Sequence, residues 1–341
     1  MSIKKEIVFL PYKASMWDSL ESIWKAAKEI PEYEVYVVPI PYYNKNSDGS
    51  FQKFYYEGEQ YPSYVPITYY EDYLFEERHP DVIFIHNPYD DCNSVTSVHP
   101  LFFSERLRNY TNLLVYIPYF VLNEIKPKKQ KQIEKMEYFC TVPGVIYADV
   151  VVVQSENIRQ IYINELTKRI GEESRKYWEE KILGLGSPKF DKIISAYQEK
   201  WDIPEDWLKI IKKSDGTWKK IFLYNISVGA LLKYKEKMLK KIKEVLQIFR
   251  ENREEITLWW RPHPLIEETM ISMEPQLLEE YQRLIEQYKQ EKWGIYDDTA
   301  DFIRSIIMSN AYYGDKSSLV PLYQKTGKPI LIQNIENIQD I

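Results

Sequence analysis

The sequence lacks the features that mark several common classes of protein. It has 2 cysteines in 341 residues, Cys92 and Cys140, which are too few for a disulfide framework or a cysteine-rich metal site and are typical of a reducing compartment. The N-terminus has no signal-peptide core, and no apolar run approaches the roughly 20 residues that span a bilayer. We therefore expect a cytoplasmic protein, with peripheral docking at the inner face of a membrane left open.

Catalytic motifs of fixed spacing are missing as well. There is no glycine-rich phosphate loop of either common type, no HExxH and no nucleophile elbow, and Gly184-x-Gly186 lacks a third glycine. The sequence therefore predicts no bound cofactor and no metal. Its 45 basic and 51 acidic residues give a net charge of -6, so nothing in the overall charge indicates a nucleic-acid partner.

The pattern that is present indicates an α/β protein of two domains. A chain of 341 residues is too long for one ordinary core and suggests two domains of about 150 residues each. Short apolar runs alternate with helical patterns, and this alternation predicts doubly wound parallel sheets. We expect an N-terminal domain over residues 1–192, a linker over 193–216 and a C-terminal domain over 217–341. Residues 44–66 are expected to form an irregular excursion.

Two short polar segments follow apolar runs late in the chain. Arg261-Pro262-His263-Pro264 comes after the run 256–260, and Gly314-Asp315-Lys316-Ser317-Ser318 comes after the run 311–313. Ligands of open α/β sheets bind outside the carboxyl ends of the strands, where the next helix presents free N–H groups. A guanidinium, an imidazole and paired hydroxyls at such positions suit a phosphate.

Each of these residues also has a structural interpretation. Arg261 and His263 could be satisfied by backbone carbonyls in a tight loop, and the two interpretations are evenly balanced. Ser317 or Ser318 could serve only as a helix N-cap. For Asp297 and Asp298, which precede another predicted helix, the capping role is the favoured one.

Histidines supply the candidates for a catalytic base. His86 follows the predicted strand 81–85, and an imidazole has a pKa suited to proton removal near neutral pH. His99 is the second choice, whereas His79 precedes the strand and is interpreted as structural. The loop carboxylates Asp90 and Asp91 could orient a histidine or bind a metal, but such side chains are more often simply solvated.

Several segments in this order resemble the CDP-glycerol glycerophosphotransferase family of teichoic-acid synthesis. They are Gly186-Ser187-Pro188-Lys189-Phe190-Asp191, Lys220–Tyr224, Trp260-Arg261-Pro262-His263, Gly314–Ser318 and Gly327-Lys328-Pro329. The resemblance covers most of the chain from about Asp149 onward. It implies a GT-B fold, in which two Rossmann-like domains face a cleft, with the acceptor on the N-terminal side and the nucleotide donor on the C-terminal side.

The resemblance also implies a reaction. Glycerol phosphate would move from CDP-glycerol to a hydroxyl of a growing polymer or a lipid-linked primer, with release of CMP. The donor's diphosphate would be held by Arg261, His263, Asp315, Ser317 and Ser318. His86 would act as the catalytic base, and His263 would help to stabilise charge on the departing CMP.

Two other functions remain open because a fold does not decide a substrate. One is a GT-B glycosyltransferase that uses a nucleotide sugar. The other is a catalytically silent GT-B domain that binds a nucleotide or a partner.

Overall fold

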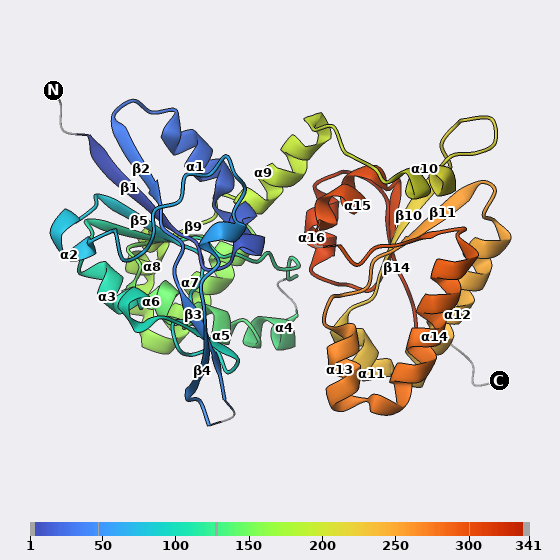
Figure 1. The fold of residues 1–341 in the computed structure, drawn as a ribbon. Helices are drawn as coiled ribbons and strands as arrows, with labels where there is room; N and C mark the ends of the chain where they lie inside the picture. Colours follow the sequence, from blue (N-terminus) through green and yellow to red (C-terminus); the bar gives the residue numbers. More distant parts are fainter. Residues whose placement is uncertain (1–3, 47, 127–128, 300, 337–341) are drawn as a thin grey trace. The chain divides into compact units, whose positions relative to one another are not determined.

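The computed structural model describes residues 4–46, 48–126, 129–299 and 301–336. Contacts between residues divide the chain into two compact units, residues 1–192 and residues 193–341. Figure 1 shows that each unit contains a twisted sheet with helices on both of its faces. This arrangement confirms the predicted fold class of doubly wound α/β domains.

The first unit is built on a six-stranded parallel sheet. In spatial order the strands are β2 (Tyr33–Val37), β1 (Lys5–Leu10), β5 (Val82–Ile85), β7 (Leu113–Tyr116), β8 (Val150–Val152) and β9 (Ile182–Leu183). The chain steps outward from β1 to β2, then returns to the other side of β1 and continues in the opposite direction. The strand order therefore reverses between β1 and β5, and such a reversal is where open α/β sheets bind ligands.

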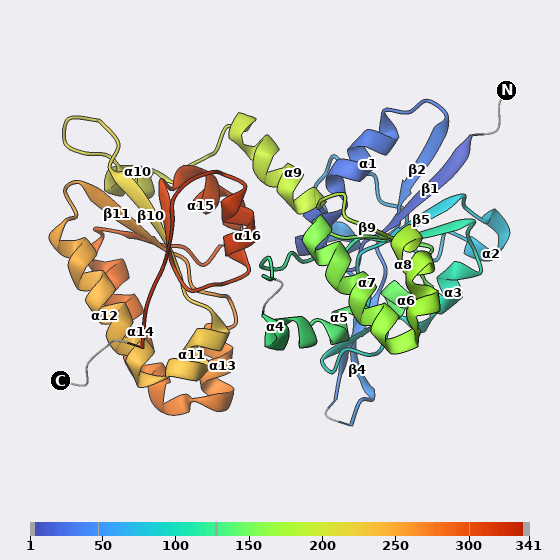
Figure 2. The ribbon, with the colours of Figure 1, turned by 180° about the vertical axis from the view of Figure 1, so that it is seen from behind.

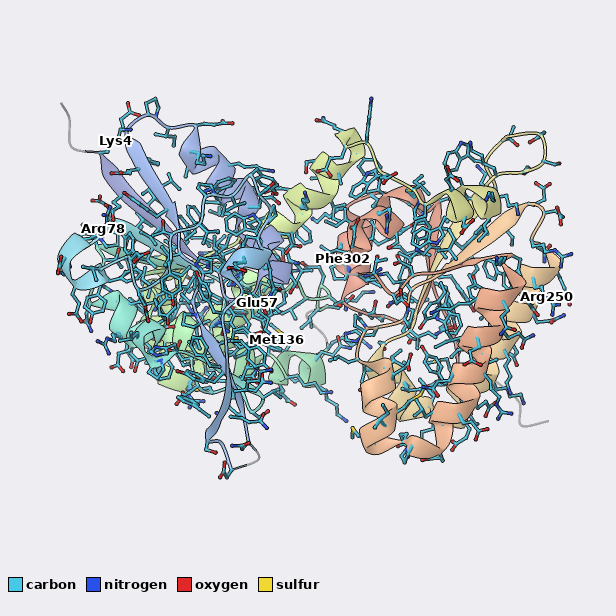
Figure 3. All side chains as sticks on the ribbon, viewed as in Figure 1. Lys4, Glu57, Arg78, Met136, Arg250 and Phe302 are labelled. Atoms are coloured by element: carbon cyan, nitrogen blue, oxygen red, sulfur yellow. The ribbon has the colours of Figure 1, made fainter. Side chains whose placement is uncertain are left out.

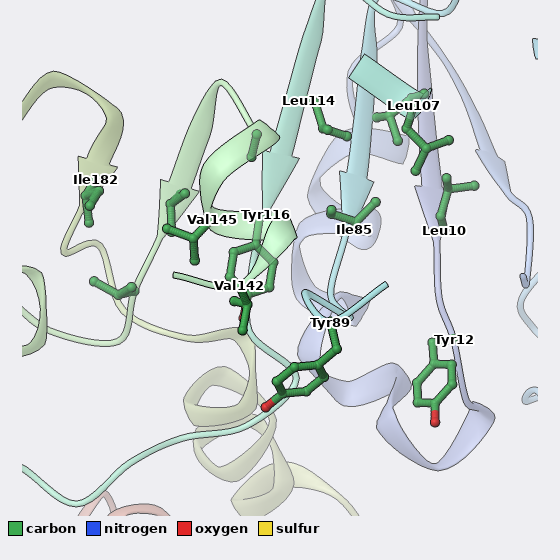
Figure 4. Close-up of a cluster of buried hydrophobic side chains, with 14 of the residues drawn as sticks. Leu10, Tyr12, Ile85, Tyr89, Leu107, Leu114, Tyr116, Val142, Val145 and Ile182 are labelled. Atoms are coloured by element: carbon green, nitrogen blue, oxygen red, sulfur yellow. The ribbon is translucent and has the colours of Figure 1, made fainter. Parts of the chain in front are cut away.

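Helices cover both faces of this sheet because its strands are apolar on both sides. In β1, Ile7 and Phe9 face one core, which includes Trp24 of α1 (Glu21–Lys28), while Val8 and Leu10 face the other. Figure 4 shows Leu10, Ile85 and Tyr116 projecting from neighbouring strands into this second core. In chain order the helices are η1 (Ala14–Ser19), α1 (Glu21–Lys28), η2 (Gly58–Gln60), α2 (Phe75–Arg78), η3 (Pro100–Phe102), α3 (Ser104–Arg108), α4 (Gln130–Glu134), α5 (Glu137–Cys140), α6 (Pro143–Tyr147), α7 (Glu156–Ile170), η4 (Glu172–Ser174), α8 (Arg175–Lys181) and α9 (Pro188–Ser195). Figure 2 shows α7 and α8 in front of the sheet when it is seen from behind.

The expectation of an irregular excursion over residues 44–66 is wrong in part. A three-stranded antiparallel sheet, in the order β4 (Phe51–Tyr55), β3 (Tyr42–Lys45), β6 (Thr96–Val98), includes part of this stretch. The ring of Tyr43 stacks on that of Phe51 at 4.6 Å across the hairpin. Sequence pattern misses the sheet because β4 is almost wholly exposed and therefore lacks an alternation of apolar and polar residues.

The second unit contains a five-stranded parallel sheet. In spatial order its strands are β12 (Ile295–Tyr296), β11 (Ile256–Trp260), β10 (Lys220–Asn225), β13 (Ala311–Gly314) and β14 (Ile330–Ile332). Here the order reverses between β10 and β13, so these two strands mark the switch point of this unit. Buried side chains again lie on both faces, with Trp259 and Trp260 of β11 pointing to opposite sides.

Helices connect successive strands of this unit. Figure 3 shows the side chains that fill the space between the helices and the sheet. In chain order the helices are η5 (Ala196–Gln198), α10 (Glu205–Ile211), α11 (Val228–Tyr234), α12 (Glu236–Glu251), α13 (Ile266–Met273), α14 (Pro275–Glu291), α15 (Phe302–Met308) and α16 (Leu319–Gln324). The stretch 193–216, expected as a linker, contributes α10, which contacts β11 and sets Trp207 against Trp259 with ring centroids 5.0 Å apart.

Two further observations on the described residues concern membrane-spanning helices and cysteines. No helix in the described ranges is long and apolar enough to cross a lipid bilayer. Both cysteines are free thiols, Cys92 exposed and Cys140 buried.

Gly314 permits the close approach of β13 to β10 at the switch point. Its φ is +149°, and a Cβ atom at this position would lie 2.1 Å from the carbonyl oxygen of Asn225. We expect Gly314→Ala to lower the free energy of unfolding by about 1–3 kcal/mol or more, because both strain and overlap must be relieved. Urea denaturation of the purified chain measures the change.

Gly229 provides the matched control for this substitution. It lies in α11, and no atom stands within 4 Å of the position its Cβ would take. Gly229→Ala should leave stability unchanged or raise it by up to about 1 kcal/mol, since alanine is the better helix former. Equal losses of stability in the two variants would contradict the role assigned to Gly314.

Candidate functional site

The carboxyl edge of the second sheet gathers polar groups around its switch point. Strand β10 ends at Asn225, the loop continues through Ser227 into α11, and β13 ends at Gly314, directly before Asp315. Asn225, Asp315 and Ser317 are all buried. Because buried polar groups need partners, their contacts show how this edge is organised.

Asp315 holds the loop that follows β10. Its Oδ2 accepts a hydrogen bond from the backbone N–H of Ser227 at 2.9 Å, and its Oδ1 accepts one from the Nε2 of Gln333 at 2.7 Å. Burial raises the pKa of this carboxyl above its ordinary value, while the hydrogen bonds oppose that shift. Asp315 therefore fixes the start of α11, where the hydroxyl of Ser227 caps the helix by accepting from the N–H of Ala230.

Asn225 connects the switch point to the Arg-Pro-His turn. Its Nδ2 donates to the carbonyl oxygen of Arg261 at 2.7 Å, and its own carbonyl oxygen accepts from the N–H of Asp315. The side-chain Oδ1 of Asn225 is buried and has no hydrogen-bond partner within the described part of the chain. The described residues thus leave one acceptor at the switch point unsatisfied.

Arg261 is buried and held in a fixed position. Its Nη2 donates to the carbonyl oxygen of Thr299 at 2.5 Å, and its Nη1 lies 2.8 Å from Oδ2 of Asp297 in an ion pair but outside hydrogen-bonding geometry. Asp297 is itself held by the indole N–H of Trp259 and by Thr299. The guanidinium is thus bonded in part by the protein itself, and among the described residues Nη1 has no hydrogen-bond acceptor.

A cavity of ≈ 170 Å³ lies beside Arg261 and His263. Its wall also includes the aromatic rings of Tyr281 and Tyr296. Nδ1 of His263 accepts from the N–H of Leu265 at 3.2 Å, and burial lowers the pKa of the ring. The neutral ring therefore carries its hydrogen on Nε2, which makes His263 a hydrogen-bond donor at that atom.

Ser317 and Ser318 differ in their surroundings. Ser317 is buried, and its Oγ lies 3.2 Å from the hydroxyl of Tyr312 and accepts from the N–H of Leu319. Ser318 is exposed and precedes α16 without making a side-chain cap. The capping interpretation thus fits Ser317 better than Ser318.

All five predicted donor-site residues belong to the second unit, but they form two groups. Strands β11 and β13 pair with opposite edges of β10, so the turns after them flank the loop after β10 from two sides. The side chain of Arg261 turns to Asp297 and Thr299, whereas that of Asp315 turns to Ser227 and Gln333. Asn225 and the loop after it separate the two groups.

His86 lies at the switch point of the first unit, directly after β5. It is 0 % exposed. Its Nε2 accepts from the N–H of Tyr12 at 2.6 Å, and its Nδ1 lies 2.7 Å from Oγ of Ser19, which in turn donates to the carbonyl oxygen of Met16. The hydrogen of the neutral ring is therefore on Nδ1, and neither nitrogen is available to a substrate.

Burial and the nearby Lys189 lower the pKa of His86 to about 3. A base must accept a proton near neutral pH, so both the contacts and the pKa argue against the predicted role. The geometry instead makes His86 a residue that positions the loop after β1.

The two switch points are built alike. Asp315 follows the end of β13 by one residue and binds the N–H of Ser227, which lies two residues beyond β10. His86 follows the end of β5 by one residue and binds the N–H of Tyr12, which lies two residues beyond β1. In each unit, a side chain after one central strand holds the loop after the other.

The remaining sequence candidates either have structural partners or lie on the surface. Asp90 is buried and accepts two hydrogen bonds from Ser104 at the start of α3, and burial raises its pKa to about 7. Nδ1 of His99 accepts from the N–H of Leu101. Asp91, Asp298 and His79 are exposed. Within the described ranges, no group of three or more histidine, cysteine, aspartate or glutamate side chains could hold a metal ion.

Sequence reasoning did not single out Asn225, Ser227 or Tyr12. Each lies at the end of a central strand or within two residues of it. Their position after a strand is a usable signal, but their partners come from distant segments, and no local pattern reveals those contacts.

The buried imidazole of His86 can be observed directly by NMR. We expect its ring nitrogens to show the Nδ1–H tautomer and to keep their chemical shifts between about pH 5 and pH 8, because the ring stays neutral with a pKa of about 3. A ¹⁵N-labelled sample and a His86→Gln variant identify the resonances. A titration with a midpoint close to the ordinary 6.5 would show that the ring is accessible to protons.

No protein-family model matches the sequence, and a search of curated proteins found no match. Solved structures do match. A UDP-N-acetylglucosamine 2-epimerase aligns with 100% of this chain and 80% of its own, at 12% identity and a TM-score of 0.57. A putative UDP-N-acetylglucosamine 2-epimerase from Listeria monocytogenes aligns with 96% and 79%, at 13% identity and a TM-score of 0.57.

The wall teichoic acid polymerase TagF is also similar. It aligns with 95% of this chain and 69% of its own, at 14% identity and a TM-score of 0.50. At such identities the likeness concerns the fold, which in these neighbours is of the GT-B type. Together with the two switch points, the comparison confirms that this chain has the GT-B fold.

Proposed function

We propose that this chain is a GT-B enzyme that acts on a nucleotide-activated sugar, as a transferase or an epimerase. The observation that carries the proposal is the switch point of the second unit, where Asn225, Ser227 and Asp315 meet at the carboxyl edge of the sheet. The nucleotide would bind there, because ligands of open α/β sheets bind at the reversal of strand order.

The polar groups of this edge divide between two parts of such a donor. Arg261 and His263 supply N–H donors beside the ≈ 170 Å³ cavity, and these suit the oxygens of a diphosphate. Asn225 Oδ1 is an unpartnered acceptor and suits a hydroxyl of the ribose or the sugar. We propose that Ser317 and Ser318 complete the phosphate site through the start of α16.

The choice of a nucleotide sugar rests on the neighbouring structures. Those with the higher TM-scores, 0.57 for two proteins, are named as UDP-N-acetylglucosamine 2-epimerases. Shared fold alone does not transfer their substrate, but it supports testing a UDP-sugar first.

Transfer of glycerol phosphate from CDP-glycerol to a polymer or lipid-linked acceptor is the second candidate. The order of the Arg-Pro-His and Asp-Lys-Ser-Ser segments favours it, and the fold shared with the teichoic acid polymerase is compatible with it. In either reaction we propose that His86 positions the loop after β1, since both of its ring nitrogens are already bonded.

Thermal unfolding with candidate donors separates these reactions. UDP-N-acetylglucosamine should stabilise the chain, by about 2.7 kcal/mol at a concentration 100 times its dissociation constant. Product analysis of the same mixtures then distinguishes epimerisation from release of UDP. Stabilisation by CDP-glycerol alone, with release of CMP, would replace the first candidate with the second, and no stabilisation by any nucleotide would contradict both.

Arg261→Lys tests the phosphate site without removing the cation that Asp297 needs. We expect nucleotide binding to weaken about tenfold or more, because lysine lacks the planar set of N–H donors. Isothermal titration with UDP measures the change. Arg304→Lys is the matched control, since Arg304 is a half-buried arginine of the same unit that packs over the ring of Trp207 and should leave binding unchanged. Equal effects of the two substitutions would remove Arg261 from the site.

A further inference from the structure

A groove on the first unit is not used by the proposed donor site. Its volume is ≈ 370 Å³, which is within the range of small-molecule sites. The groove is formed by the segment before α2, by α2 itself, and by η3 and α3, and Figures 1 and 2 both show α2 and α3 as neighbours. Its lining residues are Tyr70, Glu71, Tyr73, Leu74, Phe75, Glu76, Glu77, His99, Leu101, Phe102, Arg106 and Tyr110.

Aromatic and aliphatic side chains form the base and sides of this groove. The buried ring of Phe102 contacts Tyr70 and Phe75, each with ring centroids 6.0 Å apart and nearly perpendicular planes. Leu74 and Leu101 remain 51% and 42% exposed. Apolar surface of this kind packs against the C–H groups of a ligand and fixes its plane.

The rim supplies hydrogen-bonding groups of both kinds. Nδ1 of His99 accepts from the backbone, so Nε2 of the neutral ring is a donor. The exposed carboxylates of Glu71 and Glu77 are acceptors, and Glu71 accepts only the hydroxyl of Tyr70 among the described contacts. A ligand with several hydroxyl groups can use both kinds of partner.

The charges in the groove select against anionic ligands. Arg106 lies in an ion pair with Glu76 at 3.4 Å and over the ring of Tyr110 at 6.0 Å, so a resident cation already occupies the aromatic position that a cationic ligand would take. Glu71 and Glu77 repel phosphate and other anions. The lining holds three carboxylates and one arginine, so the groove excludes anions, and an oligolysine peptide tests the cationic alternative to a neutral ligand.

The lining also differs from a peptide site of the strand-addition kind. None of the lining residues belongs to a strand, so the groove offers no strand edge for an added peptide strand. An apolar base, hydrogen-bonding groups on the rim and repulsion of anions match the alternating C–H and hydroxyl surfaces of a sugar ring.

We propose that this groove binds a neutral glycan, with the sugar rings packed against Leu101 and Tyr70 and hydroxyls bonded to His99, Glu71 and Glu77. The site is distinct from the nucleotide site in residues and in unit, and the proposal holds whichever nucleotide donor the second unit binds. A glycan held here would be an acceptor or a carrier of the product.

Isothermal titration with chitotetraose and cellotetraose tests the proposal. We expect saturable binding of at least one, in the millimolar range or tighter, and a loss of about tenfold or more in Leu101→Asp and in Glu77→Ala. Leu185→Asp is the control, because Leu185 is 75% exposed, belongs to the same unit and lies outside the lining.

Three results would overturn the glycan site. They are no saturable binding of either tetrasaccharide, equal losses in Leu101→Asp and Leu185→Asp, and stronger binding of a poly(glycerol phosphate) oligomer or an oligolysine peptide than of the sugars. Thermal shifts with UDP are measured on the same variants and should not change. The failure of the nucleotide site and the failure of the glycan site are thereby separate observations.

Discussion

One hydrogen bond across the reversal of strand order organises each half of this protein. In the second unit the carboxylate of Asp315 accepts the N–H of Ser227, and in the first unit the imidazole of His86 accepts the N–H of Tyr12. At such a reversal the helices leave the two central strands on opposite faces, so no ladder of backbone hydrogen bonds continues there. A side chain satisfies an N–H group of the loop in its place, because a buried donor without a partner costs about 1–3 kcal/mol.

The two units differ in the chemistry of these two side chains, and therefore in what each switch point can bind. Asp315 is an acid surrounded by further polar groups, including an acceptor of Asn225 that no described residue satisfies. His86 is a neutral ring whose two nitrogens are both used and whose pKa burial lowers to about 3. The edge of the second sheet thus keeps hydrogen-bonding capacity for a ligand, whereas the corresponding position of the first sheet is closed.

The groups that a surface leaves available for bonding also explain why the first unit would bind a different class of ligand, and at a surface other than its switch point. An open surface of suitable size lies between α2, η3 and α3, where both apolar side chains and carboxylates line the groove. Charged phosphate is favoured where N–H donors and a guanidinium are fixed, as beside Arg261. It is disfavoured where Glu71 and Glu77 surround the opening. Each proposed ligand therefore follows from the charge that each site presents.

The sequence by itself determined the α/β class, most of the parallel strands and the presence of polar turns after β11 and β13. These are local properties, since apolar runs and helical periodicity act over neighbouring residues. It did not reveal the antiparallel sheet containing the exposed strand β4. Only the tertiary structure decided that Arg261 pairs with Asp297, that Asp315 binds Ser227 and that His86 is enclosed by Tyr12 and Ser19. Those outcomes depend on burial and on partners 36 to 88 residues away, and such contacts leave no periodic signal in the chain.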